Sequence, residues 1–444
     1  MTTAATREAP RADVARRAAF AVLRDVRRGA AWQVAWRRHG RSAVGGLDRR
    51  FAQELASGSL RLRARLDHAL APHSARPLVR LDADVLDLLR LGAYQVLEME
   101  RVPDWSAVHA TVDLAKRVRP RATSFVNAVL RSLLRAGKEI AYPDAVTEPL
   151  RFLTTAGSHP EWLVRRWLDR FGADETLALC AYANARPELC LRVHPPRATR
   201  AEVLALLPGS RPGRWCDVAV RGAGRGYASV RALLARGLVS VQDESGMLVT
   251  AEAAARPGES WLDLAAAPGG KACHLASRVG VAGRVLAFDT TAAKVQRIRD
   301  NAARLGLDNL VAAVADARQV RAPECDGVLV DAPCSGLGVL SRRPDARWRK
   351  TAADVERLPA LQLELLEAGL RHVRAGGVLV YSVCSFEPEE TAAVVARFAR
   401  SHPELRLESG GGPEALRREP GILYFLPQRH GIDGGFVARW RRPD

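Results

Sequence analysis

The chain has 444 residues and carries 67 Lys and Arg against 49 Asp and Glu, a net charge of +18 at pH 7. This length excludes a single ordinary core and predicts two or three domains. The charge favours an anionic partner, nucleic acid first, although a composition rich in Arg and Ala can also reflect codon usage.

The N-terminal sequence and the spacing of the cysteines indicate the cellular location and the kinds of site to expect. The first 20 residues do not combine a basic start with a sustained apolar run, and charges interrupt the apolar stretches throughout, so neither a signal peptide nor a membrane span is expected. The seven cysteines form an odd set without a C-x-x-C pair, and the histidines do not cluster with them. We therefore expect no disulfide framework, no metal site and a cytoplasmic location.

Residues 1–145 are predicted to form an all-α domain. Apolar residues recur three and four positions apart, for example at Val126, Val129 and Leu133, as one buried helical face requires. Over residues 1–150 there are 26 Lys and Arg against 16 Asp and Glu, which is more than half of the excess positive charge. The segment shows no chemistry of its own, so we interpret it as a binding module.

Residues 146–240 are predicted to form a small α+β segment. A helix opens after Pro160 and runs to Phe171, a second helix follows, and residues 189–193 form a short strand. Arginines recur between 197 and 236 with Trp215 among them, which suits RNA backbone contacts and base stacking. An ordinary solvated surface is the alternative.

Residues 241–444 alternate between strands and helices, which predicts a Rossmann-like, doubly wound α/β domain with a mainly parallel sheet. The expected strands are 261–264, 284–288, 310–314, 327–330, 377–381 and 436–440. The expected helices are 271–278, 292–305, 358–373 and 388–399.

Acidic residues and a small-residue loop follow the strands of this domain, where ligands bind in an open α/β sheet. Asp289, Asp316 and Asp331 follow the second, third and fourth strands. The loop after the first strand contains Ala265, Ala266, Ala267, Pro268, Gly269, Gly270 and Lys271. A lone Asp at such a place is usually a helix cap. The set of four strand ends, without G-x-G-x-x-G or a P-loop, favours S-adenosylmethionine over NAD, with Asp289 on the ribose hydroxyls.

Two cysteines also follow strands of the predicted sheet. Cys334 and Cys384 should share the cofactor-bearing edge, and each is followed by Ser. Their alternative is the common fate of a free cysteine, a small buried hydrophobe. That alternative is preferred for the cysteines without such a setting, Cys180, Cys190, Cys216, Cys273 and Cys325.

Three motifs of the α/β domain, DLAAAPGGK, VDAPCSGLGVLSRRPDARW and YSVCSFEPEE, resemble those of the Sun-type (RsmB-type) RNA cytosine-5 methyltransferases. The resemblance covers nearly the whole chain, because HPEWLVRRW and NARPELCLRV resemble the middle segment of that family, and SFVNAVLR resembles its NusB-like RNA-binding domain. It implies S-adenosylmethionine-dependent methylation at C5 of an unpaired or extruded cytosine in ribosomal RNA, small-subunit RNA first.

The resemblance also implies residue roles. Cys384 is the expected nucleophile toward cytosine C6, and Cys334 is expected to help release the product. Asp331 is expected on the N3/N4 edge of the base or between base and cofactor. The 265–271 loop, Asp289, Asp316 and Asp331 are expected to hold S-adenosylmethionine. The chain departs from the family at Val383, where Thr is usual, and at Gly435, where an aromatic is usual.

Residues directly after the Cys334 loop are expected to face RNA, with surface charge as the alternative. They are Arg342, Arg343, Arg347 and Trp348. Other functions stay open at this point: methylation of a cytosine in another RNA such as tRNA, methylation of an exocyclic nitrogen or a protein, or a non-catalytic RNA-binding or ribosome assembly factor. We expect a monomer.

Overall fold

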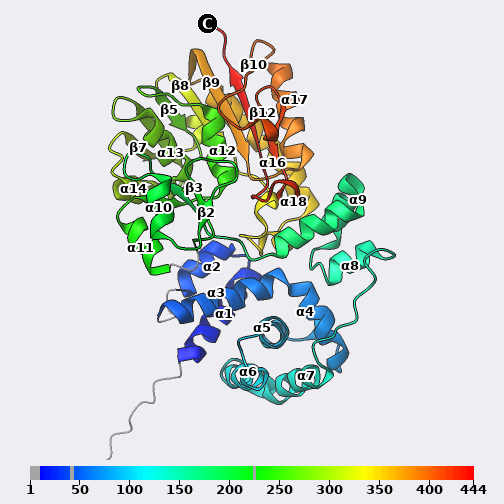
Figure 1. Ribbon diagram of the computed structural model, residues 1–444. Helices are drawn as coiled ribbons and strands as arrows, with labels where there is room; N and C mark the ends of the chain where they lie inside the picture. Colours follow the sequence, from blue (N-terminus) through cyan, green and yellow to red (C-terminus); the bar gives the residue numbers. More distant parts are fainter. Residues whose placement is uncertain (1–10, 41–44, 224–226) are drawn as a thin grey trace, which may run out of the picture. The chain divides into compact units, whose positions relative to one another are not determined.

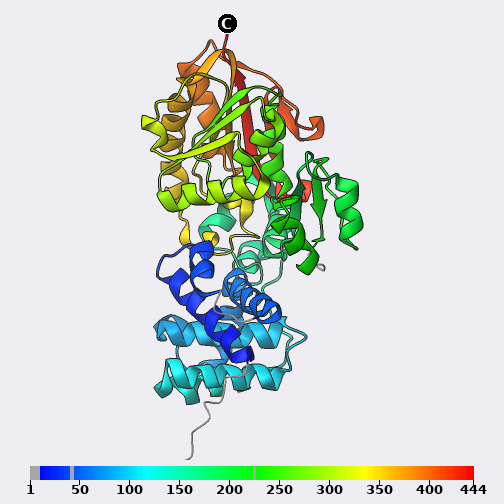
Figure 2. The same ribbon diagram turned by 90° about the vertical axis from the view of Figure 1, so that its left-hand side faces the viewer.

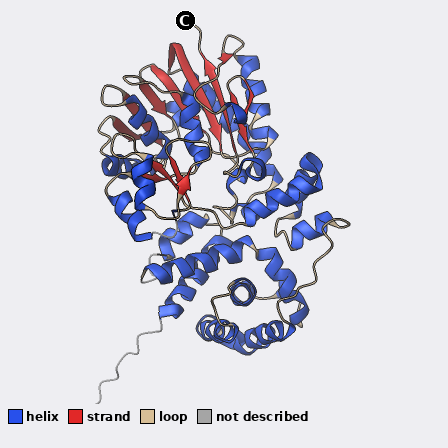
Figure 3. Ribbon diagram, viewed as in Figure 1, coloured by secondary structure: helices blue, strands red, loops and turns tan. Residues whose placement is uncertain are grey.

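The structure is a computed structural model that describes residues 11–40, 45–223 and 227–444. The chain divides into two compact units (Figure 1). Unit 1 contains the chain up to Ala185 together with Leu340–Lys350, and unit 2 contains Arg186–Val339 and Thr351–Asp444. Figure 3 shows that unit 1 is helical and that the strands belong to unit 2. The predicted domain boundaries at 145 and 240 stay predictions.

Unit 1 is built from amphipathic helices around one apolar core, as predicted. Leu55, Leu66, Leu88 and Leu130 are all fully buried in that core. Asp82 caps the N-terminus of helix α5 by accepting hydrogen bonds from the main-chain N–H groups of residues 84 and 85. The helices are α1 (Arg11–Arg27), α2 (Trp32–His39), α3 (Gly46–Arg61), α4 (Arg63–Leu70), α5 (Ala83–Glu98), α6 (Asp104–Val118), α7 (Thr123–Ala136), α8 (Pro149–Thr155), α9 (Glu161–Asn184) and α15 (Ala346–Arg349).

The middle segment is divided between the two units. Helix α9 is interrupted at Gly172, whose φ of 77° is non-helical, so the two predicted helices meet there end to end. Beyond α9, unit 2 begins with a four-stranded antiparallel sheet in the order β2-β3-β1-β4. Its elements are β1 (Cys190–Val193), α10 (Arg200–Leu206), β2 (Arg211–Pro212), β3 (Ala219–Arg221), α11 (Tyr227–Ala235) and β4 (Val239–Val241).

The main sheet of unit 2 has the order β11-β12-β13-β9-β8-β5-β6-β7, with β10 paired to β13. Neighbours from β9 to β7 are parallel, and β13 pairs with β9 in antiparallel orientation. The strands are β5 (Ser260–Asp263), β6 (Arg284–Asp289), β7 (Leu310–Val314), β8 (Cys325–Asp331), β9 (Val373–Val383), β10 (Arg406–Leu407), β11 (Arg417–Glu419), β12 (Ile422–Phe425) and β13 (Gly435–Arg441). This confirms the predicted Rossmann-like α/β fold.

Helices cover both faces of this sheet (Figure 2). Alternate residues of β8 enter different cores: Leu329 packs with residues of α12, α13 and α14, whereas Val328 and Val330 pack with residues of α16 and α17. A strand buried on both faces reads as a continuous apolar run, which is why the sequence predicted it. The helices are α12 (Glu244–Ala253), α13 (Gly270–Val279), α14 (Ala292–Leu305), α16 (Ala352–Leu370), α17 (Ala392–Ser401) and α18 (Pro427–His430).

Several elements differ from the prediction. Strands β10, β11 and β12 and helix α12 were not predicted, and β9 begins at Val373 rather than 377. Helix α16 begins at Ala352 rather than 358, because Thr351 and Asp354 form a capping box and Pro359 is accommodated inside the helix. The predicted helix 388–399 is a 3₁₀ turn, Pro388–Glu390, followed by α17. Within the described residues, no helix has the length and apolarity needed to cross a membrane.

Candidate active site

Cys334 and Cys384 meet at the carboxyl ends of neighbouring strands. Cys334 lies in the loop after β8, and Cys384 directly follows β9, which pairs with β8 in parallel. The two Sγ atoms are 3.2 Å apart, and both side chains are partly exposed. The loops are tied together by a hydrogen bond from Gly338 N to Cys384 O (3.1 Å). Two cysteines that are partly exposed therefore bring their sulfurs into contact at this edge of the sheet.

An ion pair lies on the same sheet edge. Lys271 Nζ donates to Asp331 Oδ2 (2.6 Å), and Ser382 Oγ donates to Asp331 Oδ1 (2.6 Å). Both members of the ion pair are partly exposed. Although burial alone would lower the pKa of Lys271, the charge and hydrogen bond of Asp331 raise it, with further contributions from Cys384 and Asp263. A fixed cation thus stands near the Cys384 thiol.

The two thiols are electrostatically distinct. The hydrogen bond to Cys384 raises the pKa of Cys334 well above its ordinary value, and burial and the charges of Cys384, Glu390 and Asp331 act in the same direction. In a coupled pair, one sulfur keeps the shared proton while the other ionises. The surroundings of Cys334 therefore favour its protonated form.

The loop after β5 leads into the N-terminus of α13. Gly269 has a φ of 100°, in the left-handed region, and a Cβ there would lie 3.1 Å from Ile298 Cα. Glycine fits this backbone without strain, and the turn leads directly into the helix N-terminus. The N–H groups of residues 266, 267 and 269 are hydrogen-bonded within unit 2. The predicted residues 265–271, called the cradle below, therefore lie at the carboxyl end of the sheet, and cofactor binding by them stays a prediction.

Asp289 and Asp316 also stand at this edge. Asp289 is buried and accepts hydrogen bonds from Ala267 N (3.0 Å) and Lys294 Nζ (2.7 Å). Lys294 is half exposed, whereas Asp289 is buried. Asp316 is partly exposed and forms an ion pair with Arg318 (2.7 Å).

Asp263 is a buried carboxyl that sequence reasoning did not assign to the site. It is 0% exposed, and within the described chain its two oxygens make no hydrogen bond of normal geometry. Burial raises its pKa to about 8, Asp331 adds to the rise, and Lys271 and the Ala265 N–H oppose it. A buried carboxyl without full compensation, beside the glycine cradle, fits a cationic ligand such as a sulfonium amino acid. The residues present therefore fit S-adenosylmethionine.

The two departures from the family pattern have structural counterparts. Val383 is buried in β9 opposite Phe436. A Cβ on Gly435 would lie 2.5 Å from the ring of Phe425, so the Phe425 ring occupies the space a side chain would need. An aromatic group thus stands beside Gly435 although the residue itself has none.

The prediction that Arg347 faces RNA is wrong. Arg347 is 0% exposed within unit 1. Its guanidinium donates to Ser158 O (3.1 Å), Asn184 Oδ1 (2.6 Å) and Ala183 O (2.9 Å). A planar fork of five donors suits this role, since it satisfies several acceptors left by helix ends.

Trp348 also makes contacts within unit 1, but it is partly exposed, so its contact with RNA stays a prediction. Its indole Nε1–H donates to Leu60 O (2.7 Å), and Arg63 lies over the ring at 5.3 Å. Arg343 is exposed and Arg342 is intermediate, so RNA contact by these two stays a prediction.

Unit 1 carries a groove between α6 and α7. The groove has a volume of about 700 Å³ and is lined in part by Val108. Trp105, which also lines it, is 73% exposed. Arg131 and Arg135 are exposed and make no ion pair within the described chain. An exposed indole beside two available cations can stack a base and contact phosphates.

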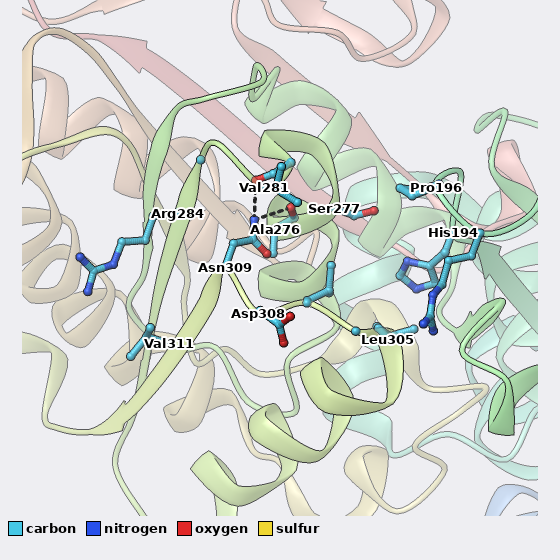
Figure 4. A pocket seen from close by; sticks show the side chains of 15 residues that line it. His194, Pro196, Ala276, Ser277, Val281, Arg284, Leu305, Asp308, Asn309 and Val311 are labelled. Carbon is cyan, nitrogen blue, oxygen red and sulfur yellow. Dashed lines mark hydrogen bonds between the residues drawn. The ribbon is translucent and has the colours of Figure 1, made fainter.

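A second cavity, of about 620 Å³, lies at the opposite end of the strands (Figure 4). It is lined by Arg284 and Val311, near the starts of β6 and β7, and by Asn309, which donates to Ala276 O (2.9 Å) and Gly280 O (2.8 Å). His194 is its one imidazole, and burial lowers the pKa of that ring to about 3. It contains no pair of reactive groups comparable to the cysteines.

Comparisons with known proteins match the whole architecture. The family profile of the 16S rRNA methyltransferase RsmB/F matches residues 251–441, the NusB family profile matches 13–135, and the ferredoxin-like domain profile of RsmF/B-like methyltransferases matches 159–211. These matches confirm the resemblance inferred from the three motifs and the NusB-like N-terminal domain.

Similar proteins extend over most of the chain. A probable ribosomal RNA small subunit methyltransferase B from Bacillus subtilis is 37% identical over 88% of this chain and 89% of its own length. The ribosomal RNA small subunit methyltransferase B of Pseudomonas putida is 37% identical over 88% of this chain and 90% of its own. The crystal structure of PH0851 superposes with a TM-score of 0.82 at 25% identity, covering 98% of this chain and 99% of that one.

Proposed function

The chain belongs to the RsmB/F family of S-adenosylmethionine-dependent small-subunit rRNA methyltransferases, and we propose that it methylates C5 of a cytosine through a covalent bond from Cys384 to C6. The observation that carries this proposal is the 3.2 Å approach of the Cys334 and Cys384 sulfurs beside the Lys271–Asp331 pair. A methyltransferase acting on an exocyclic nitrogen has no use for two such sulfurs.

Covalent catalysis answers a chemical difficulty, because C5 of cytosine is a weak carbon nucleophile. When the Cys384 thiolate adds to C6, an S–C6 bond forms and the C5–C6 π electrons become available at C5. When bound, S-adenosylmethionine would be held by the 265–271 cradle, Asp289, Asp316 and Asp263, and it would supply the methyl group to C5 and leave as S-adenosylhomocysteine. Lys271 and the Cys334 S–H favour the thiolate form of Cys384.

Cys334 is suited to the second half of the reaction. Once Cys384 is bonded to C6, its charge and hydrogen bond no longer raise the pKa of Cys334, so Cys334 can lose its proton to solvent. The Cys334 thiolate then removes the proton from C5. The C5–C6 double bond re-forms, the S–C6 bond breaks, and Cys384 leaves as a thiolate.

The Lys271–Asp331 pair offers a basis for choosing cytosine. The Asp331 carboxylate accepts hydrogen bonds, as the N4 amino group of cytosine requires, and the Lys271 ammonium donates, as N3 requires. Uracil reverses both groups on that edge. We therefore assign base selection to this pair, on a base extruded from its stack.

Two alternatives make different predictions. A cytosine in tRNA would use the same residues, so bisulfite sequencing of small-subunit rRNA and of tRNA from cells with and without the gene separates the substrates. Loss of one 5-methylcytosine in small-subunit rRNA supports the proposal. A non-catalytic assembly factor would bind no S-adenosylmethionine in calorimetry and leave every methylation unchanged.

A further inference from the structure

The residues that follow the two cysteines form a buried contact. Ser335 is 2% exposed and Ser385 is 0% exposed, whereas both cysteines are partly exposed. Ser335 Oγ lies 3.2 Å from Ser385 Oγ. In each Cys-Ser pair the cysteine is thus the more exposed residue and the serine the more buried one. The two loops contact each other through the two sulfurs and through the two hydroxyl groups.

Glu390 holds this inner contact. It ends the 3₁₀ turn Pro388–Glu390 and is 0% exposed. Its Oε1 accepts the main-chain N–H of Ser335 (2.7 Å), and its Oε2 accepts the Ser335 hydroxyl (2.5 Å). Both oxygens of one carboxylate therefore fix the residue next to Cys334, with the geometry of a short charge-assisted hydrogen bond.

Gln362 fixes the residue on the other side of Cys334. Its Nε2 donates to Pro333 O (3.1 Å) and lies 3.2 Å from Glu390 Oε1. The Tyr381 hydroxyl lies 2.7 Å from Glu390 O and 3.0 Å from Gln362 Oε1, and donates its one proton to one of them. The residues on both sides of Cys334, Pro333 and Ser335, are thus held by one buried hydrogen-bond network of Glu390, Gln362 and Tyr381.

We propose that Glu390 is a positioning residue that keeps the Cys334 sulfur at a fixed distance from Cys384 by clamping Ser335 against Ser385. Its consequence for methylation rests on the proposed function, whereas the clamp itself concerns only the two sulfurs. Burial raises the pKa of Glu390, and hydrogen bonds from Ser335, Ser385 and Gln362 oppose the rise. These hydrogen bonds are the reason that a carboxylate can be kept at this depth.

The charge of Glu390 serves a second purpose at the same site. It is one of the charges that raise the pKa of Cys334. Since a higher proton affinity makes Cys334 a stronger base once Cys384 is bonded, removing the charge should slow release of the product more than formation of the adduct.

Disulfide formation measures the clamp without methylation. With diamide, the two thiols lose two protons and two electrons to the reagent, which becomes the hydrazine, and a Cys334–Cys384 disulfide forms. Peptide mass mapping distinguishes this bond from reactions of the other cysteines. We expect Glu390→Ala to form it about a hundredfold more slowly, because a displacement of about 1 Å costs about that factor in a proximity-dependent reaction.

Glu390→Gln is the conservative comparison, since its amide oxygen can still accept the Ser335 N–H. It should restore most of the disulfide rate but still accumulate the covalent RNA adduct, because the charge is absent. Ser335→Ala should be non-additive with Glu390→Gln, as expected of residues that act through one contact.

Glu252→Gln is the matched control. Glu252 is also 0% exposed in unit 2, and it holds a different loop by accepting from Gly410 N (2.9 Å) and Gly412 N (3.0 Å). Its substitution should lower thermal stability but leave the disulfide rate unchanged. S-adenosylmethionine affinity should be unchanged in both Glu390 variants.

The proposal is overturned if Glu390→Ala folds and forms the disulfide at the wild-type rate, or if cofactor affinity falls as much as the disulfide rate, which would indicate general unfolding. If Glu390→Ala does not fold, the disulfide rate and the rate of product release are measured in Glu390→Gln and Ser335→Ala instead. The proposal is overturned if both variants show wild-type values for both rates. An active Cys384→Ala variant with a slow disulfide in Glu390→Ala would instead reject the covalent mechanism and leave the clamp standing.

Discussion

Lys271 Nζ lies 2.6 Å from Asp331 Oδ2, and this ion pair joins the first turn of α13 to the end of β8. The cofactor cradle and the cysteine loops are therefore linked by one cation. In the proposed mechanism the same cation favours the thiolate form of Cys384 and donates to the base, so one side chain would serve the cofactor, the nucleophile and the substrate.

Replacing this cation should weaken the nucleophile. In Lys271→Met, alkylation of Cys384 by iodoacetamide at pH 7 should be about tenfold slower, the effect of about 1.4 kcal/mol of lost thiolate stabilisation. The rate is followed by peptide mass spectrometry. Lys294→Met, which removes the lysine beside Asp289, should leave alkylation unchanged and alter only cofactor binding. Equal alkylation rates in all three proteins would reject the role of Lys271.

The two cysteines should fail at different steps. Cys384→Ala should abolish methylation, because no S–C6 bond can form. Cys334→Ala should trap a protein–RNA adduct that survives denaturing electrophoresis, because the C5 proton is not removed. Cys216→Ala, at a partly exposed cysteine outside the pair, is the control and should retain turnover. Full turnover by Cys384→Ala would end the covalent mechanism.

Six strands of the main sheet were predictable from the sequence because they contain apolar runs such as Val328–Val330, which is buried on both faces of the sheet. The short strands β10, β11 and β12 were not predicted, because two to four residues give too little pattern. The two cysteine loops were predictable because parallel strands place their carboxyl ends at one edge. The burial of Arg347 was not, since proximity in sequence to Cys334 says nothing about which helix ends the guanidinium meets. Glu390 was missed for a related reason: an acidic helix start is normally a cap, and only the fold brings it under Ser335.

Asp263 should make stability depend on pH in the direction opposite to most carboxylates. Its pKa is about 8 in the folded protein, above its ordinary value of 3.8, so the folded state binds more protons than the unfolded state between those pH values. Stability should therefore fall as pH rises from about 4 to about 8. Thermal unfolding of wild type and Asp263→Asn tests this. The melting temperature of the variant minus that of wild type should be higher at pH 8.5 than at pH 5. A constant difference in melting temperature would contradict it.

The α6–α7 groove should contribute RNA affinity. Trp105→Ala should weaken binding of a small-subunit rRNA fragment by about 1–3 kcal/mol, the worth of one stacked base. Arg131→Ala and Arg135→Ala should each reduce the slope of log affinity against log salt by about one unit. Fluorescence anisotropy measures both effects. Arg165→Ala, an exposed arginine paired with Glu161 on α9, is the control and should change little. Unchanged affinity in all the groove variants would indicate that the groove binds a protein or nothing.

Arg343 and Arg347 stand four residues apart and should separate RNA binding from folding. Arg347→Ala leaves Ser158 O, Asn184 Oδ1 and Ala183 O without their buried donor, so we expect a loss of about 3 kcal/mol in the free energy of unfolding. Arg343→Ala removes an exposed side chain and should leave stability within about 0.5 kcal/mol. If Arg343 contacts phosphate, its variant should bind RNA more weakly and with a shallower salt dependence. Denaturant unfolding and anisotropy on the same preparations give both numbers. If Arg347→Ala were as stable as wild type but bound RNA more weakly, the original prediction that Arg347 faces RNA would be correct after all. Only an exposed guanidinium can be removed without leaving buried acceptors unpaired.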